Sequence, residues 1–390
     1  MTRVTVHEYA AALRPRYRAV RRKEKGRILD EFCRTTGLHR KAAVRLLNEE
    51  SRPRAVRQGR PRKYGPEVLD PLRRVWESGD RMCGKLLAAV MADLVAGLER
   101  HGELKLSDQV REQLLSMSSS TIDRLLRRQH RRLSDLLPRR KPTAQASLKN
   151  EVPVRTWSEW RDVKPGSLQA DLVFHSGESL EGFHLTTLCT VDVASSWVEL
   201  QPVWGLGQER VGAALHHIRQ RLPFPLQGLH TDNGSEFINH ALVLWCRREQ
   251  ISFSRGRAYR KNDQAYVEQK NWLSVRRNVG YERYSSKAAY ELLQKLYPLL
   301  SLQLNFLRPV RKLIAKERLG AKTRKRYDAP RTPYQRLVAS GVLSDEAQAR
   351  IDKHLLALNP ADLKRRIDGL LHQLWSLAET TKGGSLVSAG

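Results

Sequence analysis

Apolar residues in the first 130 positions recur at the spacing of a helix rather than of a strand. Residues 25–35 and 40–48 each have one apolar face, and Gly37 lies in the break between them. A longer stripe follows, and a helical core explains it more simply than a functional site does: Leu86, Leu87, Val90, Leu94 and Leu98. The pattern predicts all-α structure for this part of the chain.

The pattern changes to short β-rich runs between positions 155 and 285. Five strands are expected there, over 168–174, 183–193, 197–203, 228–231 and 251–254. Helices are expected over 208–221, 235–250 and 263–278. Strands first and alternating helices afterwards predict an α/β layer around a five-stranded mixed sheet.

After this block in the sequence, residues 288–304 are expected to form a helix that packs on the core. The basic stretch 308–331 suits contact with DNA, and a flexible arm is an equal alternative. Apolar residues on one face of a last helix either mediate self-association or pack on the domain: Leu363, Ile367, Leu370, Leu371 and Leu374. The expected fold is thus an α/β core, preceded by helical domains and followed by a basic, mostly helical region.

Composition shifts divide this order into seven parts. We expect an N-terminal helical domain over 1–50, a basic linker over 51–65, a second helical domain over 66–140, a linker over 141–158, the α/β core over 159–285, the basic C-terminal region over 286–380 and a disordered tail over 381–390.

The charge balance points to a polyanionic partner. The chain has 70 Lys and Arg against 41 Asp and Glu, a net charge of +29 and a pI near 10.4. Residues 1–150 hold +18 of this charge and residues 151–390 only +11, so the N-terminal part is the main candidate for gripping nucleic acid. A generally basic soluble protein is the alternative.

Four cysteines without a CxxC pair argue against a structural zinc site and a disulfide framework. No apolar run is long enough to span a bilayer, and no signal peptide is recognisable. We therefore expect a cytoplasmic, nucleoid-associated protein without a membrane partner.

Two segments have the layout of a helix-turn-helix unit, in which a basic second helix follows a turn. In the first, Arg40, Lys41 and Arg45 are expected to face outward and contact DNA. In the second, the serine-rich cap 118–121 precedes a helix whose expected DNA contacts are Arg124, Arg127 and Arg128. An ordinary helical hairpin is the alternative for each.

The stretch 57–63 resembles the Gly-Arg-Pro core of the AT-hook. Its glycine and proline prevent a helix, and an extended Arg-Pro-Arg segment can enter a minor groove. Arg60, Arg62 and Lys63 are its candidate contacts, and a solvated linker is about as good an explanation.

Three carboxylates occupy positions that suit an active site. Asp171 lies inside a predicted strand, Asp232 follows the end of another, and Glu268 lies on a predicted helix. Converging carboxylates can hold two hard cations such as Mg²⁺ or Mn²⁺. Three ordinary surface acids are the alternative, and Asp192 is the main rival to Asp171.

The segment 230–237, His-Thr-Asp-Asn-Gly-Ser-Glu-Phe, resembles the second-aspartate motif of retroviral integrases and bacterial insertion-sequence DDE transposases. Thirty-five residues separate Asp232 from Glu268, which is the interval of that superfamily, and Asp171 matches the first aspartate. Over residues 160–285 the resemblance implies an RNase H-like core that uses two divalent cations for DNA strand cleavage and strand transfer. It makes Asp171, Asp232 and Glu268 both the catalytic residues and the metal ligands.

Neighbouring residues receive weaker assignments. Gly234 is expected to need a positive φ, and His230 is more simply structural. Gln264 and Asn271 share the helix face of Glu268, and Lys270 is a candidate DNA contact. The chain departs from retroviral integrases in having no zinc module, and in having Trp272 and Val275 where they carry basic residues after the glutamate.

The resemblance implies a transposase that binds duplex DNA, namely transposon ends and target DNA, and that assembles as a dimer or larger complex. A catalytically inactive DNA-binding regulator and an RNase H-like nuclease are the alternatives.

Overall fold

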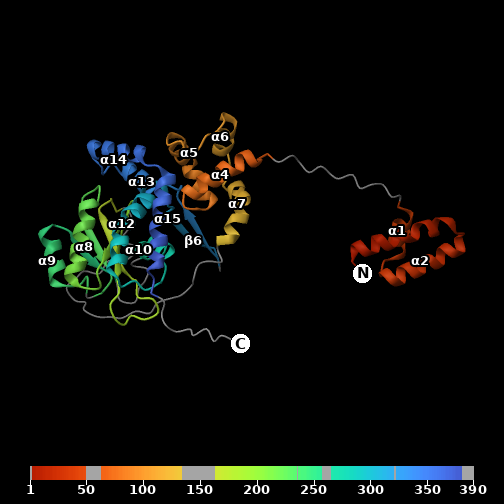
Figure 1. Cartoon of the computed structure of the whole chain (residues 1–390), viewed down its shortest axis with the longest axis horizontal. Helices are drawn as coiled ribbons and strands as arrows, with labels where there is room; N and C mark the ends of the chain where they lie inside the picture. The colour runs from red at the N-terminus through yellow and green to blue at the C-terminus, as the bar shows by residue number, and fades with distance from the viewer. Residues whose placement is uncertain are drawn as a thin grey trace. The chain divides into compact units, whose positions relative to one another are not determined.

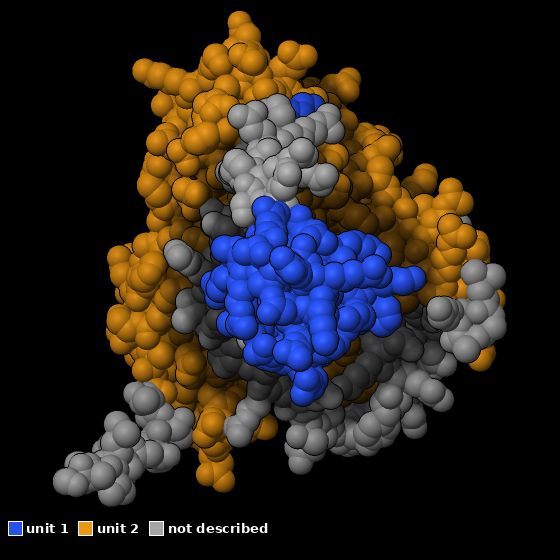
Figure 2. All heavy atoms as spheres, turned by 90° about the vertical axis from the view of Figure 1, so that its right-hand side faces the viewer, with its two compact units in different colours: residues 1–63 blue, residues 64–390 orange. Residues whose placement is uncertain are grey.

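A computed structural model describes residues 2–49, 63–133, 163–234, 236–256, 265–319 and 322–379. The chain forms two compact units, residues 1–63 and residues 64–390, which Figure 2 colours separately. Several predictions lie outside the described residues, namely those for Arg60, Arg62 and Gln264, the linkers over 51–62 and 141–158, and the tail. The side chain of Arg128 is also outside the description.

The first unit is a bundle of three helices with a core of its own. Its helices are α1 (Arg3–Ala19), α2 (Arg22–Thr36) and α3 (Arg40–Asn48). Phe32 of α2 and Leu47 of α3 are fully buried in the core that they share with α1. Gly37 ends α2 in the left-handed conformation, with φ 70°, and its N–H donates to the carbonyl of Cys33.

The second unit begins with four helices, α4 (Pro66–Ser78), α5 (Gly84–Arg100), α6 (Asp108–Leu115) and α7 (Ser119–Leu133). The described part of residues 66–140 shares one hydrophobic core with the C-terminal helices, since Leu94 of α5 and Ile367 of α15 (Pro360–Ser376) belong to the same buried cluster. Apolar surface that a small domain would leave exposed is thereby buried.

The expected five-stranded mixed sheet with flanking helices is confirmed. Its strands are β1 (Ser167–Phe174), β2 (Thr186–Asp192), β3 (Val198–Val203), β4 (Gly228–Thr231) and β5 (Ser252–Arg255), in the order β3-β2-β1-β4-β5. The first three strands are antiparallel neighbours, whereas β4 runs parallel to β1, and β5 parallel to β4.

Different helices cover the two faces of this sheet. Leu168, Ala170 and Leu172 of β1 pack in one cluster with residues of α8 (Gln208–Arg221) and α9 (His240–Arg248). Val173 packs in the other cluster, with residues of α10 (Ala265–Lys270) and α12 (Lys287–Leu302). Figure 1 shows α8 and α9 on one side of the strands and α10, α12 and α15 on the other. Asp171 lies two residues before Val173 in β1, and alternate residues of a strand point to the same face of the sheet. The side chain of Asp171 therefore faces the layer that contains α10.

The helix expected over 263–278 is interrupted by a π-helical stretch. After α10 the chain continues as a π-helix over Asn271–Arg276 and then as α11 (Arg277–Val279). A second π-helical stretch, Gln303–Leu307, continues α12.

The C-terminal region contains a β-hairpin that the sequence did not predict. Strands β6 (Leu313–Leu319) and β7 (Lys322–Tyr327) form a separate antiparallel two-stranded sheet within the basic stretch. Helices α13 (Pro333–Ser340), α14 (Asp345–Ala357) and α15 follow it. The apolar stripe of α15 packs inward on the second unit, with Leu363, Ile367, Leu371 and Leu374 buried. None of the helices in the described part of the chain has the length and apolar character needed to cross a membrane.

Candidate active site

The register of β1 and β4 brings the two candidate aspartates together. The parallel pairing runs from Ser167↔Gly228 to Gln169↔His230. Two residues further along, the same register sets Asp171 beside Asp232, on the same face of the sheet. β4 ends at Thr231, so Asp232 lies where its strand leaves the sheet, while β1 continues to Phe174.

Both oxygens of the Asp171 carboxylate are engaged. Oδ1 accepts a hydrogen bond from the N–H of Leu172 at 2.9 Å, and Oδ2 accepts one from the side-chain amide of Asn271 at 2.6 Å. The Oδ1 of Asn271 is buried and has no hydrogen-bond partner among the described residues. Asn271 therefore presents a buried amide oxygen close to the carboxylate that it holds.

Two contacts fasten the helix of Glu268 to β1. The N–H of Val267 donates to Oε1 of Gln169 at 3.3 Å, and Asn271 bonds Asp171 four residues later. Gln169 and Asp171 point to the same face of the sheet because they are two residues apart in a strand. Val267 is buried and Glu268 is exposed, so Glu268 lies at the rim, between the two anchoring contacts.

The turn after β4 is held by side-chain and backbone contacts. Oδ1 of Asp232 accepts from the N–H of Gly234 at 2.9 Å, and Asn233 bonds Arg255 at 2.9 Å and the carbonyl of Gly256 at 3.0 Å. These bonds tie the turn to the end of the neighbouring strand β5. Gly234 is not among the glycines with positive φ, so that expectation was wrong. Asp232 makes the turn by accepting the N–H of Gly234, which needs no left-handed residue.

Asp232 and Glu268 lie near enough to Asp171 to affect its ionisation. The pKa of Asp171 is raised to about 7, first by burial and then by the negative charges of Asp232 and Glu268. Burial also raises the pKa of Asp232. A site that disfavours its own negative charge is one that a bound cation would stabilise.

The donor atoms fit a hard divalent cation, but they do not form a finished cage. Carboxylate and amide oxygens are the ligands that Mg²⁺ and Mn²⁺ prefer. Within the described residues, however, no three His, Cys, Asp or Glu side chains are grouped so that they could hold a metal ion. Each oxygen of Asp171 accepts one hydrogen bond and keeps a second lone pair that could bind a metal ion.

Comparison with known proteins gives one close relative in sequence. The uncharacterized protein y4rM of Sinorhizobium fredii (strain NBRC 101917 / NGR234) is 44% identical over 330 residues, which are 84% of this chain and 94% of that protein. The chain belongs to the y4rM family. No family model matches it.

Two solved structures resemble the y4rM-family chain at low similarity. The catalytic core domain of BIV integrase is 21% identical with a TM-score of 0.30, covering 45% of this chain and 95% of that one. The HTLV-2 integrase catalytic core domain, solved in complex with magnesium in a dimeric form, is 18% identical with a TM-score of 0.29, covering 38% and 93%.

Asp192, the rival to Asp171, has a structural role in this y4rM-family chain. It is buried at the end of β2 and pairs in register with Leu168, at the other end of β1 from Asp171. Its carboxylate accepts from the N–H of Gly166 and from the N–H and hydroxyl of Ser195. It therefore closes the β2–β3 turn and lies apart from the other acids.

The residues predicted to contact DNA are mostly exposed, and they lie on separate elements. Lys41 and Arg45 of α3, Lys63, and Arg124 and Arg127 of α7 are all exposed.

Two others are engaged within the protein. Arg40 of α3 is exposed and pairs with Asp30 of α2. Lys270 is only 6% exposed, and its pKa is lowered to about 8, first by burial and then by the positive charge of Arg308. The prediction that Lys270 contacts DNA placed this side chain on the surface, whereas it follows Val267 by three residues on the buried helix face.

Sequence reasoning also missed a buried polar network beside the site. His175, which follows β1, bonds Thr187 of β2 at 2.7 Å and Tyr297 of α12 at 3.3 Å, and the hydroxyl groups of Thr187 and Tyr297 bond each other. Arg276 donates to the carbonyl of Phe174 at 2.8 Å, and it stacks over Tyr281. These residues hold the last part of β1 against its covering helices. The available signal was a histidine that directly follows the apolar run Leu172, Val173 and Phe174.

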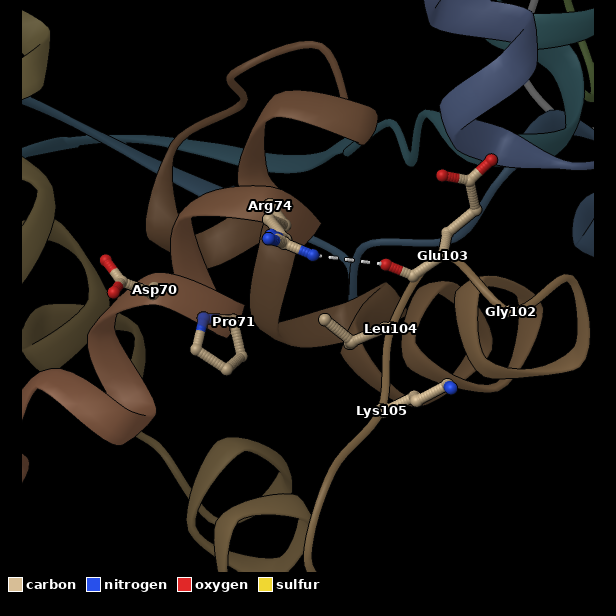
Figure 3. Close-up of a pocket in the computed structure, with 7 residues that line it drawn as sticks. All are labelled: Asp70, Pro71, Arg74, Gly102, Glu103, Leu104 and Lys105. Carbon is tan, nitrogen blue, oxygen red and sulfur yellow. Dashed lines mark hydrogen bonds between the residues drawn. The ribbon is translucent and has the colours of Figure 1, made fainter.

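One hollow in the described surface lies elsewhere, between α4 and the loop after α5. It has a volume of about 340 Å³ and is lined by residues that include Asp70, Arg74 and Glu103. In Figure 3 Arg74 points to the carbonyl of Glu103, to which it donates at 3.5 Å. Hydrogen bonds from Arg365 and Asn359 lower the pKa of the Glu103 carboxyl to about 2. This acid is used in an ion pair, so the hollow offers no group poised for proton transfer.

Proposed function

We propose that this chain is a DNA transposase of the bacterial insertion-sequence DDE type, with an RNase H-like core that cleaves DNA strands and joins them to a target. The observation that carries the proposal is the closeness of three acids: Asp171 lies on β1, Asp232 directly follows the parallel neighbour β4, and the negative charges of Asp232 and Glu268 both raise the pKa of Asp171. The motif around Asp232 and its interval to Glu268 support the same assignment.

Asp171, Asp232 and Glu268 would hold two Mg²⁺ or Mn²⁺ ions. Bound there, the ions would supply activation of an attacking oxygen and stabilisation of a leaving oxygen at phosphorus. Asn271 would position Asp171 through the hydrogen bond that it donates to Oδ2. The bonds of Asn233 to Arg255 and Gly256 would keep Asp232 at the sheet edge.

Duplex DNA is the proposed partner, both as transposon ends and as target. The net charge of +29 supports a polyanion, because each phosphate contact releases bound counterions. The three-helix unit has a glycine-ended α2 followed by α3, whose exposed Lys41 and Arg45 would face DNA. Two DNA ends have to meet in one reaction, so a dimer or larger assembly is expected on DNA.

The test is strand nicking and strand transfer in Mg²⁺ or Mn²⁺ with end-containing duplex. Asp232→Asn, Asp171→Asn and Glu268→Gln should each fall to background, while duplex binding stays within about twofold. Glu209→Gln on α8 is the matched control, because Glu209 is exposed and belongs to no ion pair among the described contacts. If Asp232→Asn joins strands at the wild-type rate, the three-carboxylate mechanism is wrong.

A second candidate is a DNA-binding regulator without catalysis. It is favoured by one observation, that no metal-holding group of acids is assembled among the described residues. The two candidates differ in a simple measurement: Mg²⁺ should raise the melting temperature of the wild type and leave that of Asp232→Asn unchanged if the acids bind it. Equal melting in both proteins, together with absent nicking, would favour the regulator.

A further inference from the structure

The β6–β7 hairpin stands out as a strongly basic element whose described side chains are mostly exposed. Residues 313–327 contain six basic residues and one acid, a net charge of +5. The hairpin is a sheet separate from the central one (Figure 1). A two-stranded hairpin alone is marginally stable in water, so a hairpin of this kind needs either a firm base or a partner.

Both faces of the hairpin are open to solvent. Arg324, Lys325 and Arg326 are consecutive residues of β7, and all three are exposed. Successive strand residues point to opposite faces, so the basic side chains surround β7 rather than lining one side. On β6 Ile314 is 62% exposed, and Glu317 is exposed as well. No packed interior is therefore built on either face by the described residues.

The base of the hairpin, by contrast, is firmly anchored. Asp328 accepts from the N–H of Lys312 at 2.6 Å, and it pairs with Arg336 of α13 at 2.7 Å. The ammonium group of Lys312 donates to the carbonyls of Val193 and Ala194, in the turn between β2 and β3. These contacts fix the base of the hairpin to the central sheet, which carries the candidate active site. An anchored basic ribbon has a defined reach, which a flexible arm lacks.

We propose that the β6–β7 hairpin grips the phosphate backbone of duplex DNA, independently of base sequence. The inference rests on the proposed function only for the identity of the polyanion. A two-stranded ribbon is narrow enough for the major groove of a duplex, and Arg and Lys are the usual phosphate contacts. The hairpin contains no Asn or Gln, the side chains that read adenine by paired hydrogen bonds.

A duplex fits the hairpin better than a single strand does. Proteins that hold single strands stack the bases on exposed aromatic rings. Tyr327 is the one aromatic residue in 313–327, and the guanidinium of Arg311 lies over its ring at 5.0 Å. Tyr327 is 39% exposed, so the hairpin offers charge along its length and one ring that is partly covered by Arg311, rather than a row of stacking surfaces.

The experiment compares the full-length wild type with the triple variant Arg324→Gln, Lys325→Gln, Arg326→Gln. Binding of a scrambled-sequence duplex is measured by fluorescence anisotropy over a salt series, with EDTA present so that no chemistry occurs. The matched control is Arg247→Gln, Lys295→Gln, Lys353→Gln, which removes the same charge from exposed residues of α9, α12 and α14. Thermal melting of the three proteins should agree, because every substituted side chain is exposed.

For the hairpin variant, the plot of log affinity against log salt concentration should be shallower, with a slope smaller in magnitude by about two to three. Each lost phosphate contact removes about 0.9 from that slope. Its duplex affinity near physiological salt should fall roughly tenfold or more, and the control should stay within about twofold. Equal losses in variant and control would overturn the proposal, because overall charge alone would then explain binding. An unchanged slope in the hairpin variant would overturn it too. The assay needs no metal, so failure of the nicking test leaves this result untouched, and the reverse holds as well.

Discussion

The carboxyl group of Asp171 is held in surroundings that favour its neutral form. Burial and two nearby acids raise its pKa from the ordinary value of 3.8 to about 7. Between about pH 4 and pH 7 the folded chain thus keeps a proton on this carboxyl group, whereas the unfolded chain has released it. Its contribution to stability is fully present below pH 4 and is lost as the pH rises through 7. Without a divalent cation, the ionised site opposes folding.

The raised pKa of Asp171 predicts how Asp171→Asn changes the free energy of unfolding. In EDTA at pH 8 the variant should be more stable than the wild type by about 1 to 3 kcal/mol, and the gain should shrink toward pH 4. Urea denaturation at both pH values measures it, and the exposed Glu209→Gln should show no such change. Equal stability of Asp171→Asn and wild type at pH 8 would mean that the acids do not oppose one another.

Asn271 is a positioning residue by the same geometry, since its amide donates to Asp171 at 2.6 Å. Asn271→Ala should lower metal-dependent nicking about tenfold while leaving duplex binding unchanged. Losing a hydrogen bond that favours the ionised carboxylate should also move the acidic limb of the pH–rate profile upward by roughly half a unit to one unit. A lower rate with an unmoved profile would indicate a general loss of structure instead.

At the scale of elements, one ion-pair cluster joins the first helices of the second unit to the segments that follow the site. Asp80, between α4 and α5, bonds Arg277 at 2.7 Å and Arg308 at 2.8 Å, and all three side chains are at most 21% exposed. Asp80 has φ 57°, a conformation that Asn also tolerates. Removing only the charge would leave two shielded guanidinium groups without their partner.

Asp80→Asn should therefore destabilise the protein by about 2 to 3 kcal/mol. The control is Asp70→Asn, because Asp70 pairs with Arg73 at the surface, where an ion pair contributes little. Chemical denaturation of both variants at pH 7 decides the matter. A similarly small effect at the two sites would show that this cluster does not hold the elements together.

The element scale also separates what the sequence could reveal from what it could not. The bounds of α8 and β4 follow from local signals, Pro223 after the helix and Gly228 at the start of the strand, and both were predicted to the residue. The β6–β7 hairpin was not predicted from the sequence. Strands are recognised by alternating apolar and polar residues, and the strands of this hairpin lack that pattern because they have no buried face.

Side-chain contacts across elements were equally out of reach. The bond between Asn271 and Asp171 spans one hundred residues, so no local pattern encodes it. The buried position of Lys270 was foreseeable, because the residue shares a helix face with Val267. Lys270 was predicted to contact DNA because it is charged, and its position on the helix face was given less weight. The two aspartates could be anticipated as a site because each lay at a strand, although their register pairing could not.

For the whole molecule, the separate core of residues 1–63 implies a divisible protein. Phe32 and Leu47 belong to a cluster that contains no residue of the second unit. A fragment of residues 64–390 should therefore melt within about 3 °C of the main transition of the full chain. It should keep metal-dependent nicking of non-specific duplex and lose preference for end sequences. Calorimetry and competition binding measure these outcomes, and a fragment that fails to fold would show that the two units depend on each other.

The π-helical stretch Asn271–Arg276 has a consequence for the gene that encodes this chain. A π-turn carries one residue more than an α-turn covering the same length, so the stretch has the form of a one-codon insertion in an ordinary helix. Removing one codon there, for example that of Ser274, should restore an α-helix and rotate all later residues by about 100°. Arg277 would then turn away from Asp80, while Glu268 and Asn271 would stay in register with β1. In related genes that lack this codon, the acid at position 80 should therefore keep Arg308 as its remaining guanidinium partner.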